Sequence, residues 1–534
     1  MIKLTFIGAD HQVTGSMHLL QTPDLNILVD CGMGQGLKIY ENAALPLNYS
    51  DIDYIILTHA HIDHSGMIPN AYKNGFRGTV LTTNASMDLD KIMLLDSANI
   101  QEQEAETENK KARRSGKKET PPAYTVEDAQ NCLKQFRALP YGKTTELSDS
   151  TKIRFIDAGH LLGSASVEVW VKDGEDERKI VFSGDIGNKN KPLIRDPEYI
   201  RDADYILCES TYGNRKHDAE TDHVADLCKI VQRTLDRGGN VLLPAFAVGR
   251  TQELLYLFRI IKEQNLITGH PGFPVYVDSP LAIEATKVFV SDIRSCFDDE
   301  TRALVEKGIN PMLFEDLRLI ISTEESKKIN SDKTPKVIIS AAGMCNAGRI
   351  RHHLRYNLWR PQSSVVFAGY QAEGTLGRKL QDGAQKVTLF GDDIVVKASI
   401  ETLPDMSSHA DCDGLLEWIG AYRNAPKKIF LVHGNDDSMA GLSEKIKEKF
   451  GYPVDCPYSG SVFDLVSGEY ECCAEPVYAK KETYIQTRNS SHKERLEGSL
   501  RALTELVGKQ LTGANADMDS LSAAIDLLVQ RFRF

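Results

Sequence analysis

The sequence lacks several features that define whole classes of protein. No run of 18 apolar residues occurs along the 534 positions, which argues against a membrane-spanning helix. The opening residues, MIKLTFIGAD, have too short an apolar run for a signal peptide and carry no cleavage pattern, so we expect no secretory leader. None of the ten cysteines belongs to a C-x-x-C pair. Scattered cysteines in so long a chain are typical of reduced thiols, and they predict a cytoplasmic protein without a disulfide framework.

Basic residues are also in deficit. The chain has 63 Lys and Arg against 75 Asp and Glu, a formal net charge of −12. This balance argues mildly against a protein that coats nucleic acid, but it does not exclude a local basic groove or a metal-lined site. One segment, KKARRSGKK, carries six Lys or Arg between Lys110 and Lys118. We interpret it as a solvated face, with contact to an RNA backbone as the alternative.

The order of apolar segments predicts an α/β protein. The length suits two to four domains, and there is no long-period repeat. Short apolar runs such as IKLTFIG, NILVD and RKIVFSGD predict strands in the first 210 residues, with a helical pattern around 85–140. From about residue 205 strands alternate with helices, which indicates a parallel sheet covered by helices. Near 491–511 and 517–532, apolar stripes follow a helical period.

Histidines are concentrated in one place. The stretch LTHAHIDHSG, residues 57–66, holds three of the 14. In extended backbone His59 and His61 point the same way, and Asp63 and His64 follow where a helix is expected to begin. One loop can therefore aim four ligand-type side chains into a small volume. Imidazole nitrogens with carboxylate oxygens suit zinc, with Mn²⁺ as second choice, whereas a set of surface and capping histidines is a poor explanation of this density.

The spacing H-x-H-x-D-H resembles the signature of the metallo-β-lactamase fold, whose two-zinc hydrolases share it. Three further positions match the motifs of that family. They are Asp30 in NILVDCG, His160 in DAGHLLGSAS and Asp185 in VFSGDIGN. In GADHQVTGS the chain departs from the family, because Gln12 stands where a glutamate is usual. No metal ligand is affected by this change.

The downstream sequence resembles the β-CASP subgroup of nucleases within that fold. The matching stretches are CESTYGNR, GMCNAGRIRHHL, SSHADCDGLL and LVHGN. Glu209 takes the place of motif A, His409 of motif B and His433 of motif C. The resemblance covers nearly all of residues 1–465. It is closer to the cleavage nuclease of polyadenylation and its archaeal and bacterial relatives than to ribonuclease J.

The resemblance implies a fold and a division into domains. We expect a metallo-β-lactamase αββα sandwich with an inserted β-CASP α/β domain, which has a parallel sheet and flanking helices, and a helical C-terminal extension. The expected segments are 1–210 and 396–475 for the sandwich, 211–395 for the insert and 476–534 for the extension. The extension either packs on its own chain or helps to form a homodimer, and both alternatives stay open.

The resemblance also implies a metal site with two zinc ions. One ion would bind His59, His61 and His160, and the other Asp63, His64 and His433. Asp185 and a hydroxide would bridge them. Such a pair can clamp the attacking and the leaving oxygens during hydrolysis of a phosphodiester.

Further residues receive roles from the same resemblance. Asp63 is expected to orient the nucleophile in addition to binding metal. His409 is expected near the scissile phosphate as a general acid, since the pKa of histidine lies near working pH. Glu209 is expected to hydrogen-bond a histidine, and Asp30 to support the ligand loop.

The resulting prediction is a zinc-dependent ribonuclease, endonucleolytic, with RNA as substrate and DNA not excluded. Two other classes remain as alternatives: a small-molecule hydrolase of lactamase or thioesterase type, and an inactive RNA-binding scaffold. The insert argues against the first and the intact ligand set against the second. Arg250, at an expected helix start, and Arg349 are weaker candidates for contact with RNA, because backbone N–H groups at such starts hold phosphate. His352 and His353 are interpreted as helix residues near the cleft between domains, not as ligands.

Overall fold

The structure is a computed structural model that describes residues 2–36, 39–217, 221–291, 296–372, 374–404 and 406–479. The tail stripes predicted near 491–511 and 517–532, and with them most of the expected helical extension, lie outside the described residues. Met1–Val477 forms one compact unit. Among the helices in the described part of the chain, none is long and apolar enough to cross a membrane.

An eight-stranded sheet contains most of the N-terminal strands. Its order is β23-β22-β1-β2-β3-β4-β5-β6, antiparallel from β1 to β3 and parallel from β3 to β6. The strands are β1 (Lys3–Gly8), β2 (Met17–Gln21), β3 (Asn26–Val29), β4 (Tyr54–Ile56), β5 (Thr79–Thr82), β6 (Phe136–Ala138), β22 (Val462–Asp464) and β23 (Glu469–Cys472).

A seven-stranded sheet faces the first, in the order β21-β20-β11-β10-β9-β8-β7. Its members are β7 (Thr145–Glu146), β8 (Thr151–Asp157), β9 (Ala165–Asp173), β10 (Asp176–Phe182), β11 (Tyr205–Glu209), β20 (Lys428–Val432) and β21 (Val454–Asp455). Apolar side chains from both sheets, such as Phe6, Val29, Val167 and Phe430, form one buried core between them. The alternating burial along β8 explains how a strand contributes to this core, because every second side chain points into it.

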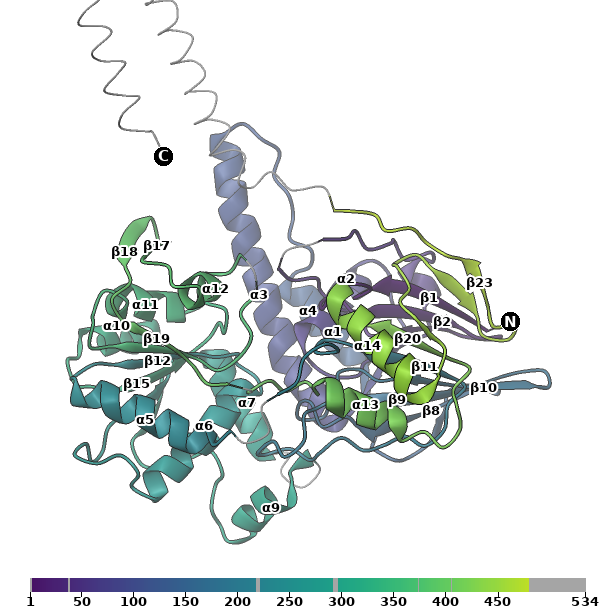
Figure 1. Ribbon diagram of the computed structural model, residues 1–534. Coiled ribbons are helices and arrows are strands. Elements are labelled where there is room, and N and C mark those ends of the chain that lie inside the picture. The colour runs from purple at the N-terminus through teal and green to yellow at the C-terminus, as the bar shows by residue number, and fades with distance from the viewer. Residues whose placement is uncertain are drawn as a thin grey trace, which may run out of the picture. The chain divides into compact units, whose positions relative to one another are not determined.

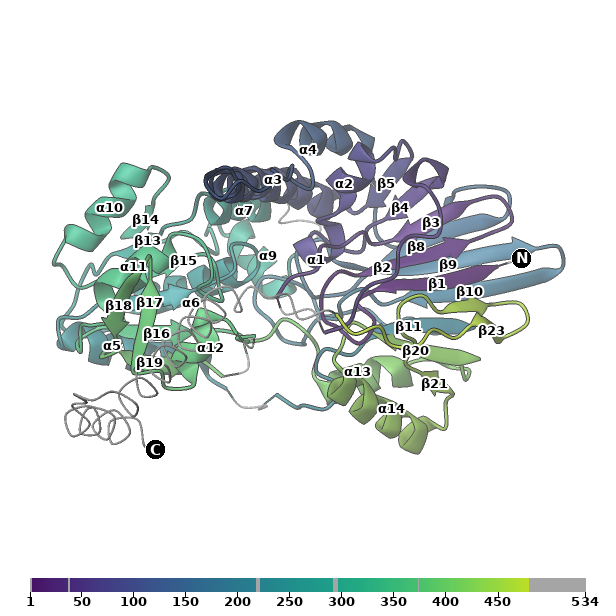
Figure 2. The same cartoon turned by 90° about the horizontal axis from the view of Figure 1, so that it is seen from above.

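Helices cover the outer face of each sheet and complete the αββα sandwich (Figure 2). On the eight-stranded sheet lie α1 (Ile62–Ser65), α2 (Ile68–Lys73), α3 (Asn84–Arg114) and α4 (Val126–Cys132), with the short 3₁₀ turns η1 (Tyr49–Asp51) and η2 (Leu133–Gln135). On the seven-stranded sheet lie α13 (Cys412–Gly420) and α14 (Asp436–Phe450). This arrangement confirms the predicted sandwich.

The inserted part, drawn in teal and green in Figure 1, contains a six-stranded parallel sheet in the order β14-β13-β15-β12-β16-β19. Its strands are β12 (Val241–Pro244), β13 (Val275–Val277), β14 (Leu317–Leu319), β15 (Val337–Ser340), β16 (Ser364–Phe367) and β19 (Ser399–Thr402). One face packs on α5 (His223–Asp236), α6 (Arg250–Glu263) and α7 (Pro280–Ser291). The other packs on α11 (Ile350–Asn357), α12 (Leu376–Gln381) and the hairpin of β17 (Lys386–Leu389) and β18 (Asp392–Val395). The helices α9 (Asp299–Glu306) and α10 (Thr323–Ser331) complete this part.

The chain leaves the seven-stranded sheet after β11 and rejoins this sheet at β20, which pairs with β11 in parallel. β19 lies between these crossings and pairs with β16 in the six-stranded sheet. The predicted boundary at residue 395 assigns β19 to the returning segment, and the domain limits stay a prediction. We propose that the inserted domain extends through Thr402.

Candidate metal centre

The ligand-type residues lie just beyond the carboxyl ends of strands. Asp30 follows β3, the H-x-H-x-D-H stretch follows β4, Asp185 follows β10, Glu209 ends β11 and His433 follows β20. His160 comes from the connection between β8 and β9. Strands of both sheets thus deliver these side chains to the same edge of the sandwich. Asp30 and His433 both have positive φ values, 59° and 49°, a backbone conformation that is uncommon outside glycine and is often held at functional sites.

The structure brings all seven predicted metal ligands together in two groups. The first group is His59, His61, His160 and Asp185, and the second is Asp63, His64 and His433. Within each group the candidate ligand atoms lie within 4.8 Å of one another.

The spacing within the first group fits a small tetrahedral cation. His59 Nε2 lies 3.0 Å from His61 Nδ1, which lies 3.2 Å from His160 Nε2. Asp185 Oδ2 lies 3.4 Å from His59 Nε2 and 3.5 Å from His160 Nε2. A tetrahedron with metal–nitrogen distances of about 2.0–2.1 Å has edges of about 3.3–3.4 Å. These four donor–donor distances are therefore close to those of a zinc coordination shell.

Asp185 occupies the position between the two groups. Its Oδ2 faces His59 and His160, whereas its Oδ1 lies 3.3 Å from His64 Nε2 and 3.5 Å from His433 Nδ1. The side chain is buried, and Oδ1 has no hydrogen-bond partner. A buried carboxylate is costly unless a cation or a donor compensates it, and the groups near Oδ1 are the imidazole rings of His64 and His433. The donor set thus fits the metal that the fold implies.

In the second group, His433 contacts both other members. His433 Nε2 lies 3.3 Å from His64 Nε2 and 3.7 Å from Asp63 Oδ2. Thr211 Oγ1 lies 3.1 Å from His433 Nδ1 and donates to the His433 carbonyl, which fixes the ring. Thr211 was not predicted from the sequence. Its position two residues after Glu209 was the only local signal.

The protonation states match the chemistry of ligation. Burial, with the charge of His59, lowers the pKa of His61 to about 3, so its imidazole is neutral and free to bind metal. Burial likewise lowers the pKa values of His59 and His160. Burial opposes ionisation of Asp185, but the charges of His433, His64 and His409 hold the pKa of that carboxyl well below its usual range.

His64 behaves differently, because its pKa is raised well above the ordinary value. Burial lowers this pKa, but the charges of Asp185 and Asp30 outweigh burial. The position that stabilises a proton on His64 is one that also stabilises a metal cation.

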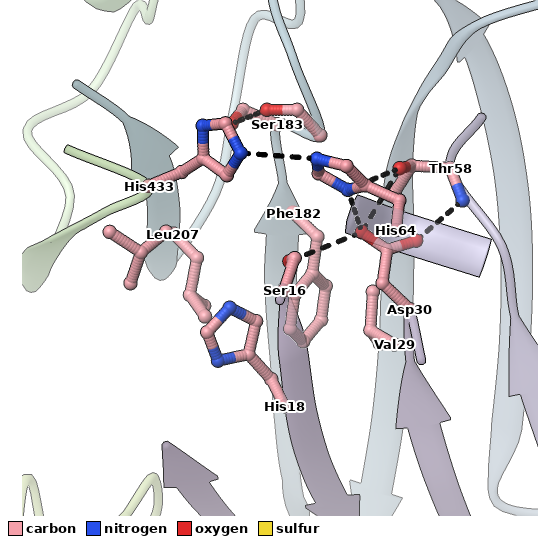
Figure 3. A pocket seen from close by; sticks show the side chains of 12 residues that line it. Ser16, His18, Val29, Asp30, Thr58, His64, Phe182, Ser183, Leu207 and His433 are labelled. Carbon is pink, nitrogen blue, oxygen red and sulfur yellow. Dashed lines mark hydrogen bonds and ion pairs between the residues drawn. The ribbon is translucent and has the colours of Figure 1, made fainter. Parts of the chain in front are cut away.

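Asp30 orients His64 by contacting Nδ1, the ring nitrogen that does not face the other candidate ligands (Figure 3). Asp30 Oδ2 accepts a hydrogen bond of 2.7 Å from His64 Nδ1, which leaves Nε2 facing His433 and Asp185. Thr58 donates its backbone N–H to Asp30 Oδ1 at 2.8 Å and its hydroxyl to Oδ2 at 3.0 Å. A carboxylate that accepts the second N–H of a ligating histidine fixes its tautomer and its orientation. His64 and His433 also line a cavity of about 20 Å³ that reaches the buried ring of His18.

Glu209 and His409 form a pair beside the first group. Glu209 is fully buried, its Oε1 accepts from the N–H of Ile186 at 2.7 Å, and it lies 3.1 Å from His409 Nδ1. The His409 ring lies 4.5 Å from the His160 ring, centroid to centroid. Burial lowers the pKa of His409, but Glu209 and Asp185 outweigh it and raise this pKa to about 9. The carboxylates of Glu209 and Asp185 therefore favour the protonated form of His409 next to the candidate ligands.

The arginines proposed for RNA contact lie in ion pairs. Arg250 pairs with Glu253 on the first turn of α6 and is largely buried. Arg349 Nη1 donates to Asp278 Oδ1 at 2.7 Å, and Nη2 donates to the carbonyl of Ile321. Their contact with a substrate stays a prediction.

Other histidines and cations singled out from the sequence lie outside both ligand groups. His353 is buried on α11 and pairs with Asp278, and His352 stacks on Phe390. Three cations of the KKARRSGKK segment pair with neighbouring acids, in Lys110–Glu106, Lys111–Glu108 and Arg113–Glu119.

Comparison with known protein families agrees with this geometry. The metallo-beta-lactamase superfamily matches residues 12–71, the Beta-Casp domain matches 251–380, and the Zn-dependent metallo-hydrolase RNA specificity domain matches 393–457. The chain is 35% identical over 447 residues to ribonuclease TTHA0252 of Thermus thermophilus, which covers 83% of this chain and 95% of that protein.

Two archaeal proteins named transcription termination factor FttA are also similar. The protein from Methanocaldococcus jannaschii is 30% identical over 465 residues, which is 84% of this chain and 69% of that protein. The protein from Methanosarcina mazei is 30% identical over 463 residues, again 84% and 69%. The fold and the site define a metal-dependent hydrolase. The chain belongs to the β-CASP family of metallo-β-lactamase-fold nucleases.

Proposed function

We propose that the protein is a ribonuclease that holds two zinc ions and cuts RNA endonucleolytically. The observation that carries the proposal is the position of Asp185, whose two oxygens face two separate groups of histidines. Such a carboxylate suits a bridge between two metals. The names of the relatives, a ribonuclease and termination factors, support a nucleic-acid substrate.

The first ion would be held by His59, His61 and His160, and the second by Asp63, His64 and His433. When bound, two metal ions lower the pKa of water toward neutrality and offset the negative charge of the phosphodiester. Mn²⁺ accepts the same nitrogen and oxygen donors and is the second choice.

The protein residues position the reactants and supply a proton. Asp63 is partly exposed at the edge of the site, so its carboxylate can accept a hydrogen bond from the attacking water and orient it toward phosphorus. His409 contacts Glu209 through Nδ1, and its other ring nitrogen is left to donate a proton to the leaving oxygen. Glu209 keeps that ring oriented and charged.

Two other functions fit the metal site alone. A small-molecule hydrolase of lactamase type needs no inserted domain. In this protein the segment that carries His409, a candidate catalytic residue, follows β19 of the inserted sheet, so the inserted domain helps to form the site. An inactive RNA-binding scaffold would have no need of seven convergent ligands. DNA offers the same phosphodiester chemistry as RNA. The proposal of a cytoplasmic location rests on the cysteine pattern alone.

A cleavage assay tests the proposal. The protein is stripped with a chelator, reloaded with zinc and given single-stranded RNA, matched DNA and a lactam. We expect cleavage of RNA only after reloading, with internal products from an RNA blocked at its 5′ end, and about two zinc ions per chain by elemental analysis. Turnover of the lactam alone, or RNA binding without any cutting by the reloaded protein, would contradict the proposal.

A further inference from the structure

Two exposed aromatic side chains lie on the edge of the inserted sheet that leads to the metal site. Phe246 follows β12 and its side chain is 45% exposed; Tyr370 follows β16 and is 47% exposed. Large apolar rings cost free energy when they are left in water, so an exposed pair beside a reaction site points to a ligand. Neither ring has a role in the chemistry described above.

The strand order places both rings at the same edge. β12 and β16 are neighbours and run in parallel, with Val241 opposite Ser364 and Leu242 opposite Val365. β12 ends at Pro244 and β16 at Phe367, so Phe246 and Tyr370 follow the same ends of two neighbouring strands, whose spacing is roughly 4.8 Å. In open parallel sheets, ligands bind beyond the carboxyl ends of the strands.

Two connections of the chain link the carboxyl ends of these strands to the candidate metal site. After Phe246 the chain reaches Gly249, where an added Cβ would lie 3.1 Å from Leu161, the neighbour of the candidate ligand His160. β19, the neighbour of β16, leads directly into the segment that carries His409. His409 itself forms a β-bridge with Gly187, two residues after Asp185. Figure 1 shows α6, which begins after Gly249, on the side of the inserted part that faces the sandwich.

The Phe246 ring and Gln371, the residue next to Tyr370, both contact the loop at Gly343. The Phe246 ring lies over Gly343, where an added Cβ would meet ring carbons at 3.2 and 3.3 Å. Thr251 donates its hydroxyl to the Phe246 carbonyl at 2.7 Å. Gln371, the buried neighbour of Tyr370, donates its side-chain amide to the carbonyl of Gly343 at 3.1 Å. Both rings therefore belong to one connected set of loops. An added Cβ at Gly369, next to Tyr370, would meet nothing within 4 Å, so the backbone there is open.

We propose that Phe246 and Tyr370 form a stacking platform for unpaired bases of the RNA strand whose phosphate is cut at the metal site. The inference rests on the proposed function and adds to it two residues, Phe246 and Tyr370, that bind the unpaired strand. Every base has a flat π face, so stacking on such rings binds a strand without reading its sequence. In a duplex these faces are already occupied by neighbouring bases. The platform therefore selects for unpaired RNA next to the cut.

The test compares variants of the zinc-loaded, full-length protein on a short unpaired RNA. Phe246→Ala and Tyr370→Ala should each weaken RNA binding by about 5- to 150-fold, the usual worth of one stacked base, and raise KM more than they lower kcat. Phe246→Leu keeps an apolar side chain over Gly343 but removes the aromatic face, so it should behave like Phe246→Ala. Tyr370→Phe keeps the ring and should bind like the wild type.

A matched control is available on the same domain. Trp359 is 56% exposed and lies before β16, at the opposite end of that strand. Trp359→Ala removes an exposed aromatic ring from the same fold and should leave RNA binding and KM unchanged. Equal losses in Trp359→Ala and Phe246→Ala would overturn the proposal, because the effect would then not depend on the carboxyl edge.

Substrates with one abasic nucleotide give a readout that a purely structural role would not move. The abasic position is shifted stepwise away from the cut. Where a base stacks on a ring, its removal should weaken wild-type binding, and the corresponding alanine variant should then lose nothing further. The platform would be overturned if the losses in RNA binding from the abasic position and from the alanine variant were additive at every position. It would also be overturned if Phe246→Leu bound RNA like the wild type. If the wild type cuts RNA and the variants match it, only this inference fails; if the wild type does not cut RNA, the proposed function fails with it.

Discussion

The Nδ1 atom of His409 lies 3.1 Å from the Oε1 atom of Glu209, although the two residues are 200 positions apart in the chain. Glu209 ends a strand of the sandwich, and His409 follows the last strand of the inserted sheet. Their contact therefore exists only when both parts of the chain are folded together. In the proposed mechanism, this contact keeps His409 oriented and charged as the proton donor beside the candidate metal ligands.

This relationship leads to the first prediction, which concerns His409. His409→Ala should keep both zinc ions and slow RNA cleavage by roughly 10²–10⁴-fold, the usual contribution of a general acid. Zinc content and single-turnover rates measure the two effects separately. Glu209→Gln keeps the shape of the side chain but loses its charge, and the expected loss is smaller, about 10–100-fold, as for other residues that orient a functional group. A loss of zinc from His409→Ala would make His409 a ligand and refute its assignment as the acid.

The second prediction concerns Asp63, which faces His433 at the edge of the site. Asp63→Ala removes a proposed metal ligand, which is also the group proposed to orient the attacking water, so it should abolish cleavage while circular dichroism shows an intact fold. The buried strand β4 before it is untouched. Glu444→Ala changes an exposed carboxylate on α14 and serves as the control, with unchanged activity. Activity of Asp63→Ala within about tenfold of the wild type, less than ~1.4 kcal/mol of barrier, would refute the assignment.

The convergence of the ligands could be predicted from the sequence because its signals are local. H-x-H-x-D-H places four side chains in one loop, and apolar runs such as ADYILCES and PKVIIS mark strands that the structure confirms as β11 and β15. The supporting contacts have no such signal. Thr58 and Thr211 are common residues whose roles depend on Asp30 and His433, which reach them only through the packed sheets.

The limits of the inserted domain show the same dependence on long-range packing. The segment VVKASIETL predicts a strand, but nothing within it determines which sheet it joins. β19 pairs in parallel with β16, with Ser364 opposite Ser399. This contact between distant parts of the chain determines which sheet the strand joins. Arg349 is a similar case, because a guanidinium at an expected helix start suits a phosphate as well as a buried carboxylate. Only the fold brings it to Asp278.

The third prediction concerns the segment after the compact unit Met1–Val477. All candidate metal and catalytic residues lie between Asp30 and His433, so truncation after residue 478 should preserve zinc binding and cleavage of a short single-stranded RNA. Light scattering on both forms would show whether the tail supports a homodimer. A truncated protein that binds zinc normally yet cuts no RNA would show that the tail reaches the substrate.

The final prediction concerns a buried network at the carboxyl edge of the inserted sheet. Asp278 is fully buried and accepts hydrogen bonds from Arg349 at 2.7 Å, His353 at 2.7 Å and Ser326 at 2.5 Å. Asp278→Ala leaves a buried histidine and a guanidinium without their acceptor and should destabilise the protein by about 3–5 kcal/mol. Thermal unfolding measures the change. Asp393→Ala, which breaks the exposed pair of Lys386 with Asp393, should leave the melting temperature unchanged.

The pH dependence of unfolding separates the charge of Asp278 from its shape. Burial raises the pKa of Asp278, but hydrogen bonds from His353, Ser326 and Arg349 outweigh burial and lower it. The stabilisation from this carboxylate is therefore fully present above its unfolded pKa of about 3.9, and it is lost as pH falls through the lower folded value. The difference in melting temperature between wild type and Asp278→Asn should stay constant from pH 7 to about pH 5 and shrink below about pH 3.9. A difference that does not shrink at low pH would show that the network depends on packing and not on the ionised carboxylate.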